Sequence, residues 1–198
     1  MEYAVLGWPE DGPQLRLDHR AFSYAGKFVM SNTGKAVARE DECETGGARG
    51  SASEDTVESS DEYDDPVAAI AFNEDRTDAG TAWLRYVTVR DERRGGGVGA
   101  KLARFASARL RERGYDEVRI AVNNPFAFHA LYKAGFGFTG ERTGIAELVL
   151  SRPGDRSPSR YQSGLDEFRE RDDLAAEERS FLDAKADEGP PDVIPDPE

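Results

Sequence analysis

A glycine-rich turn between a strand pattern and a helix pattern constrains the fold of this chain more than any other feature. Residues 81–90 are rich in Trp, Tyr, Val and Thr, which is typical of a strand, and residues 98–113 carry apolar side chains at helical spacing. Between them, residues 94–99 read Arg-Gly-Gly-Gly-Val-Gly. Without Cβ atoms an anion can approach the backbone, and the free N–H groups at a helix N-terminus attract it. The segment therefore predicts a site for a phosphate or a pyrophosphate.

Two common nucleotide-binding patterns contain a glycine-rich turn of this kind. A Walker A loop is excluded, because no Gly-Lys-Ser or Gly-Lys-Thr sequence occurs in the chain. The spacing of Gly95, Gly97 and Ala100 does satisfy the dinucleotide fingerprint G-x-G-x-x-A. That fingerprint also predicts an acidic residue at the end of the next strand, where this chain has Asn123 and Asn124. A dinucleotide is therefore disfavoured.

The order of strand and helix patterns predicts an α/β fold class. An apolar run at 67–72 and the strand at 81–90 should form an antiparallel hairpin across the turn residues between them. Asn124 suits an N-cap, with Pro125 at the first helical position. We expect strands at 3–6, 15–17, 36–38, 67–72, 81–90, 117–122, 136–138 and 145–150, and helices at 98–113 and 124–135. This order is typical of an α/β domain around a mixed sheet.

Two stretches differ from this ordered part. Residues 40–65 hold eleven acidic residues and one arginine, so we expect a disordered loop, and the acidic cluster at 61–65 lacks the spacing of an EF-hand. From about residue 156 the chain is polar, and a capping box at Ser163 and Asp166 predicts one or two weakly docked helices over 164–186. The end, from Pro190, reads as unstructured. We therefore expect a domain at 1–155 and a charged, partly helical tail at 156–198.

Composition narrows the partners and the compartment. The net charge of -13 argues against affinity for nucleic acid or for an anionic membrane surface. Only five of the 26 basic residues are lysines, and together with the low pI this resembles proteins of salt-loving archaea. One cysteine, Cys43, and two histidines give no basis for a metal centre. The sequence shows neither a secretory signal nor an apolar run of membrane-spanning length, so we expect a cytoplasmic protein.

Two motifs give the chain a specific resemblance. Residues 94–99 match at every position the acyl-CoA loop of the GNAT superfamily, which reads Arg or Gln, two residues, Gly, one residue, and Gly or Ala. Residues 131–136 read Leu-Tyr-Lys-Ala-Gly-Phe and look like the family's stretch from Leu-Tyr to Gly-Phe, one strand and one helix later. The chain thus resembles GNAT N-acetyltransferases over about a third of its length.

The resemblance implies a GNAT-like fold, with a mixed, mostly antiparallel sheet and flanking helices, and acetyl-CoA as co-substrate without a metal. The backbone near Val87 and Val89 would pair with the pantetheine arm where strands 83–90 and 117–122 splay apart. Tyr132 takes the family's role of general acid on the departing thiolate. Many relatives pair through edge strands, so a homodimer is among the expectations. The residues assigned to acetyl-CoA are Val87, Val89, Arg94, Gly95, Gly96, Gly97, Val98, Gly99, Ala100 and Asn124.

Three questions stay open in the sequence. Residues 90–113 hold eight basic and three acidic residues, an excess that suits the phosphates of CoA or merely offsets the acidic surface. Glu74, His129 and Glu147 are candidate general bases, and none is favoured. The acceptor is expected to be an amine on a small molecule, a protein N-terminus or a lysine. The alternatives are a regulatory module that binds acyl-CoA without transfer and an interaction protein that works through its acidic segments.

Overall fold

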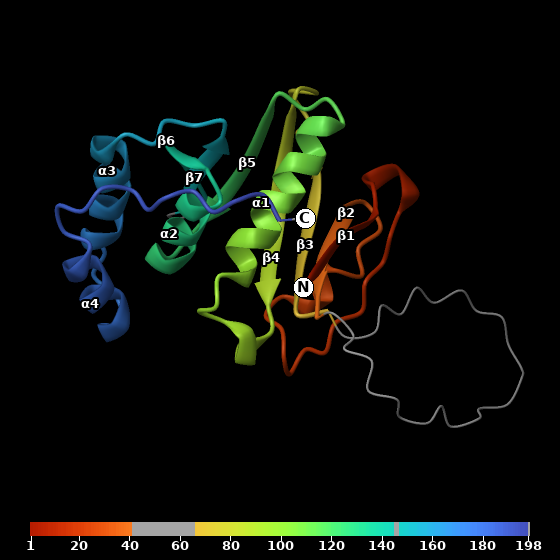
Figure 1. Cartoon of the computed structure of the whole chain (residues 1–198), viewed down its shortest axis with the longest axis horizontal. Helices are drawn as coiled ribbons and strands as arrows, with labels where there is room; N and C mark the ends of the chain where they lie inside the picture. The colour runs from red at the N-terminus through yellow and green to blue at the C-terminus, as the bar shows by residue number, and fades with distance from the viewer. Residues whose placement is uncertain (41–65, 145–146, 198) are drawn as a thin grey trace, which may run out of the picture.

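The computed structural model describes residues 1–40, 66–144 and 147–197. Within them, seven strands form one sheet in the order β1-β2-β3-β4-β5-β7-β6. β4 and β5 are parallel, and the other neighbouring strands that the structure describes are antiparallel. The predicted mixed, mostly antiparallel sheet with flanking helices is therefore confirmed (Figure 1). The strands are β1 (Glu2–Gly7), β2 (Gly34–Arg39), β3 (Ala68–Glu74), β4 (Thr81–Val89), β5 (Glu117–Val122), β6 (Gly137–Thr143) and β7 (Glu147–Arg152).

The helices follow the predicted order in the middle of the chain. Asn124 caps the second of them through its side-chain oxygen, which accepts a hydrogen bond from the Ala127 amide at 2.8 Å, and Pro125 is the first helical residue, as predicted. None of the described helices is long and apolar enough to cross a membrane. The α-helices are α1 (Val98–Glu112), α2 (Pro125–Lys133), α3 (Pro158–Arg169) and α4 (Ala176–Ala184), and the short 3₁₀ helices are η1 (Pro9–Asp11), η2 (Ala25–Lys27) and η3 (Asp91–Arg93).

The β3–β4 hairpin is closed by the polar turn that the sequence predicts. Asp75 accepts hydrogen bonds from the Thr77 amide at 2.8 Å and from the Trp83 indole at 2.6 Å. Asp78 accepts one from the Gly80 amide at 3.0 Å. These bonds satisfy the turn's backbone donors and hold the register in which Phe72 faces Leu84.

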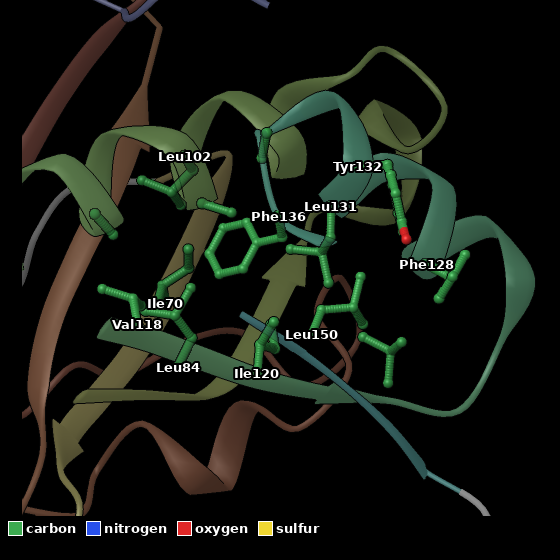
Figure 2. Close-up of a cluster of buried hydrophobic side chains, with 14 of the residues drawn as sticks. Ile70, Leu84, Leu102, Val118, Ile120, Phe128, Leu131, Tyr132, Phe136 and Leu150 are labelled. Atoms are coloured by element: carbon green, nitrogen blue, oxygen red, sulfur yellow. The ribbon is translucent and has the colours of Figure 1, made fainter. Parts of the chain in front are cut away.

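The sheet buries a different set of residues on each face. On one face α1 packs over the central strands, and Figure 2 shows side chains of the sheet pointing toward Leu102 of α1 and toward Phe136. On the other face a smaller cluster contains Leu15, Phe28 and Ala69. The predicted strand at 15–17 is therefore wrong: this segment is irregular, and the Leu15 amide donates to the Phe28 carbonyl at 3.0 Å. The prediction failed because alternating apolar and polar residues also occur in an extended loop that packs on a sheet.

The C-terminal helices are part of the main core, which differs from the prediction of weak docking. Tyr161, Leu165, Phe168 and Leu182 are at most 1% exposed and belong to the same buried cluster as the sheet. α3 also begins earlier than predicted, at Pro158 with Ser157 as the N-cap. The helix start was misplaced because the aromatic residues that dock it, Tyr161 above all, lie before the proposed capping box.

The last described residues run back over the outside of α1 and α2 (Figure 1). The Ile194 amide donates to the Lys133 carbonyl at 2.9 Å, and Arg156 donates to the Pro191 carbonyl at 2.7 Å. Arg104 of α1 pairs with Asp196 at 2.8 Å. The segment from Pro190 is irregular, but hydrogen bonds and an ion pair attach it to the rest of the chain. The residues on both sides of residue 155 share one buried cluster. The predicted disordered loop at 40–65 lies, from residue 41 onward, outside the described residues.

Candidate functional site

The parallel strands β4 and β5 separate at one end. They pair from Thr81 with Glu117 to Leu84 with Ile120. β4 continues to Val89 and stays paired with β3 on its other side. From Arg85 to Val89, therefore, the side of β4 that faces β5 has no strand partner among the described residues, and we call it the free edge. The sequence prediction that these strands splay apart is confirmed.

The ladder between β3 and β4 shows which backbone groups point to the free edge. The Arg90 amide donates to the Val67 carbonyl at 2.9 Å, so this pair is a hydrogen-bonded one. Because hydrogen-bonded and non-hydrogen-bonded pairs alternate in an antiparallel ladder, Val89 and Val87 occupy non-hydrogen-bonded positions. Their N–H and C=O groups point away from β3. These are the two residues whose backbone the sequence assigns to the pantetheine arm.

The glycine loop leads into a helix end that no side chain of the described residues caps. Gly97 is the N-cap of α1, and both it and Gly95 have positive φ angles, 78° and 80°, which glycine adopts without strain. A Cβ atom at either position would meet no described residue within 4 Å, so the described part of the chain leaves the approach to the loop open. The first amides of α1, from Val98 to Ala100, have no acceptor within the helix. This is the anion-binding geometry that the sequence predicts.

The uncapped helix end and the free edge are adjacent. A Cβ atom at Gly99 would lie 3.1 Å from Cγ2 of Val89, so the first turn of α1 packs directly on the end of β4. A larger residue at this position would require the Val89 side chain or the helix to shift by a few tenths of an ångström. The structure therefore brings together two groups of predicted cofactor residues, the strand pair and the loop from Gly95 to Ala100.

Arg94 links the glycine loop to neighbouring segments of the chain through its guanidinium. Its guanidinium contacts Asp91 at 2.7 Å, Ser23 at 2.7 Å and the Val89 carbonyl at 3.4 Å. The Asp91 amide also donates to the Ala21 carbonyl at 3.0 Å. Arg94 thus joins the loop to the N-terminal part of the chain. Sequence reasoning missed Ser23 and Ala21, because a contact across about 70 residues leaves no local pattern.

The other arginines near the loop are mostly paired with acids, which bears on the two readings that the sequence leaves open. The described ion pairs join Arg93 to Glu40, Arg104 to Asp196, Arg109 to Glu112 and Arg113 to Glu10. The reading that these arginines offset an acidic surface therefore fits better. Lys101, exposed one turn into α1, forms no ion pair with the described residues and is the cation best placed for a phosphate.

Tyr132 is buried on the sheet side of α2. It has no exposed surface, its hydroxyl accepts a hydrogen bond from the Phe138 amide at 2.9 Å, and its ring lies 4.8 Å from that of Tyr161. Burial raises the pKa of Tyr132 to about 12, so the phenol stays protonated at neutral pH. Phe138 is on β6, and β7 separates β6 from β5. The hydroxyl therefore rests over the sheet about 10 Å from β5 and does not face the free edge.

Two further residues of α2 have structural partners. His129 Nδ1 lies 2.7 Å from the Tyr161 hydroxyl, and burial lowers the pKa of His129 to about 4. The histidine is therefore neutral near pH 7 and ties α2 to α3. Asn124 uses its side-chain oxygen as the cap of α2. Its assignment to acetyl-CoA stays a prediction.

The two carboxylate candidates for the general base lie at opposite ends of the sheet. Glu74 pairs with Ala82 at the start of β4, and its side chain meets the Tyr115 hydroxyl at 3.4 Å. It is about 20 Å from the end of β4, too far to act at the free edge. Glu147 precedes Leu148, which pairs with Val122 at the end of β5. Of the two, the exposed Glu147 lies at the correct end of the sheet.

The described arrangement suits one kind of ligand. The free edge can pair with an extended, amide-containing chain, and the loop beside it can hold an anion at its end. Among residues 1–40, 66–144 and 147–197, no three metal-ligating side chains gather into a metal site. The acidic cluster at 61–65 lies outside these residues.

The family comparison agrees with this geometry. The model of the Acetyltransferase (GNAT) family matches residues 23–138, which is more than half of the chain. The chain therefore belongs to the GNAT acetyltransferase family. The match begins at Ser23, the contact of Arg94, and ends at Phe138, the contact of Tyr132. No curated protein matched the sequence.

Several solved structures are similar to the chain at low sequence identity. Nourseothricin acetyltransferase is 22% identical with a TM-score of 0.43, over 60% of this chain and 64% of that one. The PaiA N-acetyltransferase from Thermoplasma acidophilum, in complex with coenzyme A, is 23% identical with a TM-score of 0.37, over 43% of this chain and 52% of that one. Tetrahymena GCN5 is 12% identical with a TM-score of 0.44, over 65% and 72%. The chain thus spans less than two thirds of the first two proteins.

Proposed function

We propose that the chain transfers an acetyl group from acetyl-CoA to a primary amine by direct attack. The observation that carries this proposal is the free edge of β4 beside the uncapped start of α1, where a Cβ at Gly99 would lie only 3.1 Å from Val89. Membership of the GNAT family supports it.

In the proposed complex each part of the ligand meets a distinct part of the chain. The amides of the pantetheine arm pair with the backbone of Val87 and Val89, as an added strand would. The pyrophosphate lies at the amides of Val98 to Ala100, one helical turn from Lys101, which forms no ion pair with the described residues. This places the thioester at the free edge of β4.

The reaction needs a neutral amine, an oxyanion donor and a proton for the sulfur. The amine nitrogen forms a bond to the thioester carbon, and the carbonyl oxygen takes the displaced electron pair. The Val89 amide, which points to the free edge, is placed to donate to this oxygen. As the carbonyl re-forms and the C–S bond breaks, the thiolate takes a proton from Tyr132, and the new amide loses one to water or to Glu147. Solvent then returns a proton to Tyr132.

The proton donor has to move for this step. The Tyr132 hydroxyl must leave the Phe138 amide and turn toward the free edge. Its pKa of about 12 keeps it protonated until then.

The positions of Tyr132 and Glu74 favour a second candidate function. With Tyr132 held over β6 and Glu74 at the far end of the sheet, the described residues supply a binding edge more clearly than a set of proton-transfer groups. A regulatory module that binds acyl-CoA without transferring the acyl group would need only the edge and the loop.

Turnover separates the two. Acetyl-CoA is incubated with the protein and a panel of primary amines, and free CoA is measured with a thiol reagent, in dilute buffer and in concentrated KCl because of the acidic composition. The transferase account expects amine-dependent release of CoA. Protection against heat by acetyl-CoA with no release for any amine would contradict it and favour the binding module.

A further inference from the structure

β4 presents its two faces to different parts of the chain. Val87 and Val89 pack with the main core on the α1 side, whereas Tyr86 packs with the smaller cluster on the opposite face. If acetyl-CoA is held at the start of α1, it covers the α1 side of the free edge. The attacking amine then reaches the thioester from the Tyr86 side. In this respect the inference rests on the proposed function.

Residues 13–30, which we call the N-terminal arm, cover the Tyr86 face beside the free edge. The arm is fixed to the end of β4, since the Asp91 amide donates to Ala21 at 3.0 Å and Arg94 donates to Ser23 at 2.7 Å. The next residue of the arm, Tyr24, lies 6.2 Å from Tyr86 between ring centroids. The arm thus places an aromatic pair on the side from which the amine approaches.

Tyr24 is held in a conformation that a tyrosine rarely adopts. Its φ and ψ angles are 61° and 16°, in the left-handed region, and its side chain is 59% exposed. Such a backbone costs about 1 kcal/mol for a residue with a Cβ atom. An exposed ring gains little from burial to offset this cost. A ligand that packs on the ring would supply that gain.

The arm is basic within an acidic chain. Residues 13–30 hold three basic residues and one acidic residue, a net charge of +2 in a chain of net charge -13. Lys27 places its ammonium 5.8 Å from the centre of the Tyr86 ring, and neither Lys27 nor Arg20 forms an ion pair with the described residues. An unpaired cation beside the aromatic pair attracts an anionic group and repels a second ammonium.

A buried hydroxyl on the same face of β4 has no hydrogen-bond partner among the described residues. Thr88 is 3% exposed, and its Oγ1 makes no hydrogen bond with the described residues. Thr88 faces Ala69, and Tyr86 faces Ala71, so both side chains lie on the face that the arm covers. A buried hydroxyl without a partner costs about 1–3 kcal/mol, which a polar ligand group would recover.

We propose that Tyr24, Lys27, Tyr86 and Thr88 form the acceptor subsite, and that the acceptor is a primary amine carrying a carboxylate or a phosphate. The two tyrosines hold the apolar body of the acceptor, and Lys27 binds its anionic group. Thr88 donates to or accepts from the acceptor next to the amine. Free amino acids and short acidic peptides both present this chemistry.

The test compares matched acceptors on the wild type and on charge variants. Amino acids and acidic dipeptides are each paired with their uncharged amides, and phosphoethanolamine with ethanolamine, and kcat/KM is measured from CoA release. We expect the anionic member of each pair to be preferred about tenfold, less in concentrated KCl. Lys27→Glu should reverse the preference, through KM. If the preference for the acid over its amide is larger among amino acids than among dipeptides, the acceptor is a free amino acid. The reverse result indicates a peptide.

Two control variants separate this effect from general ones. Arg76→Glu makes the same change of net charge at the β3–β4 turn, at the far end of the sheet, and should leave the preference intact. Thr88→Val keeps the side-chain shape and should raise KM while leaving the acetyl-CoA Kd unchanged. A preference that is absent in the wild type, or that Lys27→Glu and Arg76→Glu change alike, would overturn the proposal.

A binding measurement tests the acceptor subsite even if the protein transfers no acetyl group. If no amine releases CoA, the transferase account fails, and binding alone is then measured. The thermal shift of the CoA-saturated protein is recorded with N-acetylated amino acids and with their uncharged amides. A larger shift for the anions, lost in Lys27→Glu, would support an anionic subsite without transfer. Equal shifts would overturn it.

Discussion

Leu84 and Ile120 are the last residues at which the parallel strands β4 and β5 pair. Beyond them β4 keeps its ladder with β3 and leaves two residues, Val87 and Val89, with backbone groups that no described strand satisfies. Exposed polar backbone at the centre of a sheet is costly unless something pairs with it. In the proposed complex, the end of the β4–β5 pairing therefore determines where the extended ligand would bind.

A proline scan of β4 tests this directly. Val89→Pro removes an amide that points to the free edge and none that bonds to β3, so the protein should fold and lose at least about tenfold in acetyl-CoA affinity. Thr88→Pro removes a donor of the β3 ladder and should lower the melting temperature strongly. Calorimetry and thermal unfolding measure the two effects. The same outcome for both variants would contradict the assignment of the free edge.

Replacing Tyr132 by phenylalanine tests the acid role. Tyr132→Phe should lower kcat by about 10²-fold with little change in acetyl-CoA Kd. It should also destabilise the fold by about 1–3 kcal/mol, because the buried Phe138 amide loses its acceptor. Because the pKa of Tyr132 is about 12, wild-type kcat should not fall through ionisation of this group up to about pH 10. Full turnover in Tyr132→Phe excludes the acid role.

His129 makes the stability depend on pH in a predictable direction. Its pKa is lowered by burial from 6.5 to about 4, so the folded state favours the neutral ring. Stability from this group is present above pH 6.5 and is lost as the pH falls toward 4. The free energy of unfolding is measured in urea at pH 7.5 and at pH 4.5. Between these pH values it should fall by about 2 kcal/mol less in His129→Gln than in the wild type. An equal loss in both proteins would refute the buried neutral histidine.

Leu182 tests whether the C-terminal helices share the main core. It is 1% exposed on α4, so Leu182→Ala should cost about 2–4 kcal/mol of unfolding free energy. Val193→Ala, at a side chain that is 38% exposed, should cost less than about 0.5 kcal/mol. Denaturant unfolding should remain a single transition. A separate early transition for the C-terminal part would support the tail that the sequence predicted.

Local patterns were enough to predict most of the fold. The hairpin, α1, β5 and the capped start of α2 follow from turn residues, periodicity and the Asn124-Pro125 pair, and the structure has each of them. The glycine loop could be recognised because its chemistry depends on missing Cβ atoms, which a sequence shows directly.

The parts that sequence reasoning missed depend on contacts between distant segments. Ser23 meets Arg94 across 71 positions, and Tyr161 meets His129 across 32. The apolar residues of α3 and α4 are sparse, yet Tyr161, Leu165, Phe168 and Leu182 are buried because they pack into the same cluster as the sheet. Likewise, the orientation of the Tyr132 hydroxyl depends on Phe138 of β6, which no helical pattern could indicate.

The central claim is that the glycine loop binds acetyl-CoA, and calorimetry on a matched pair of variants tests it most directly. Gly97→Glu puts a carboxylate at the N-cap of α1, where φ is 78°, and Gly114→Glu puts the same residue at the other end of α1, where φ is 107°. Both carry comparable backbone strain, and only the first faces the proposed pyrophosphate. We predict tight binding by the wild type and by Gly114→Glu, and loss of at least about 100-fold in affinity in Gly97→Glu. Equal affinity in both variants, or no binding by the folded wild type, would contradict the account.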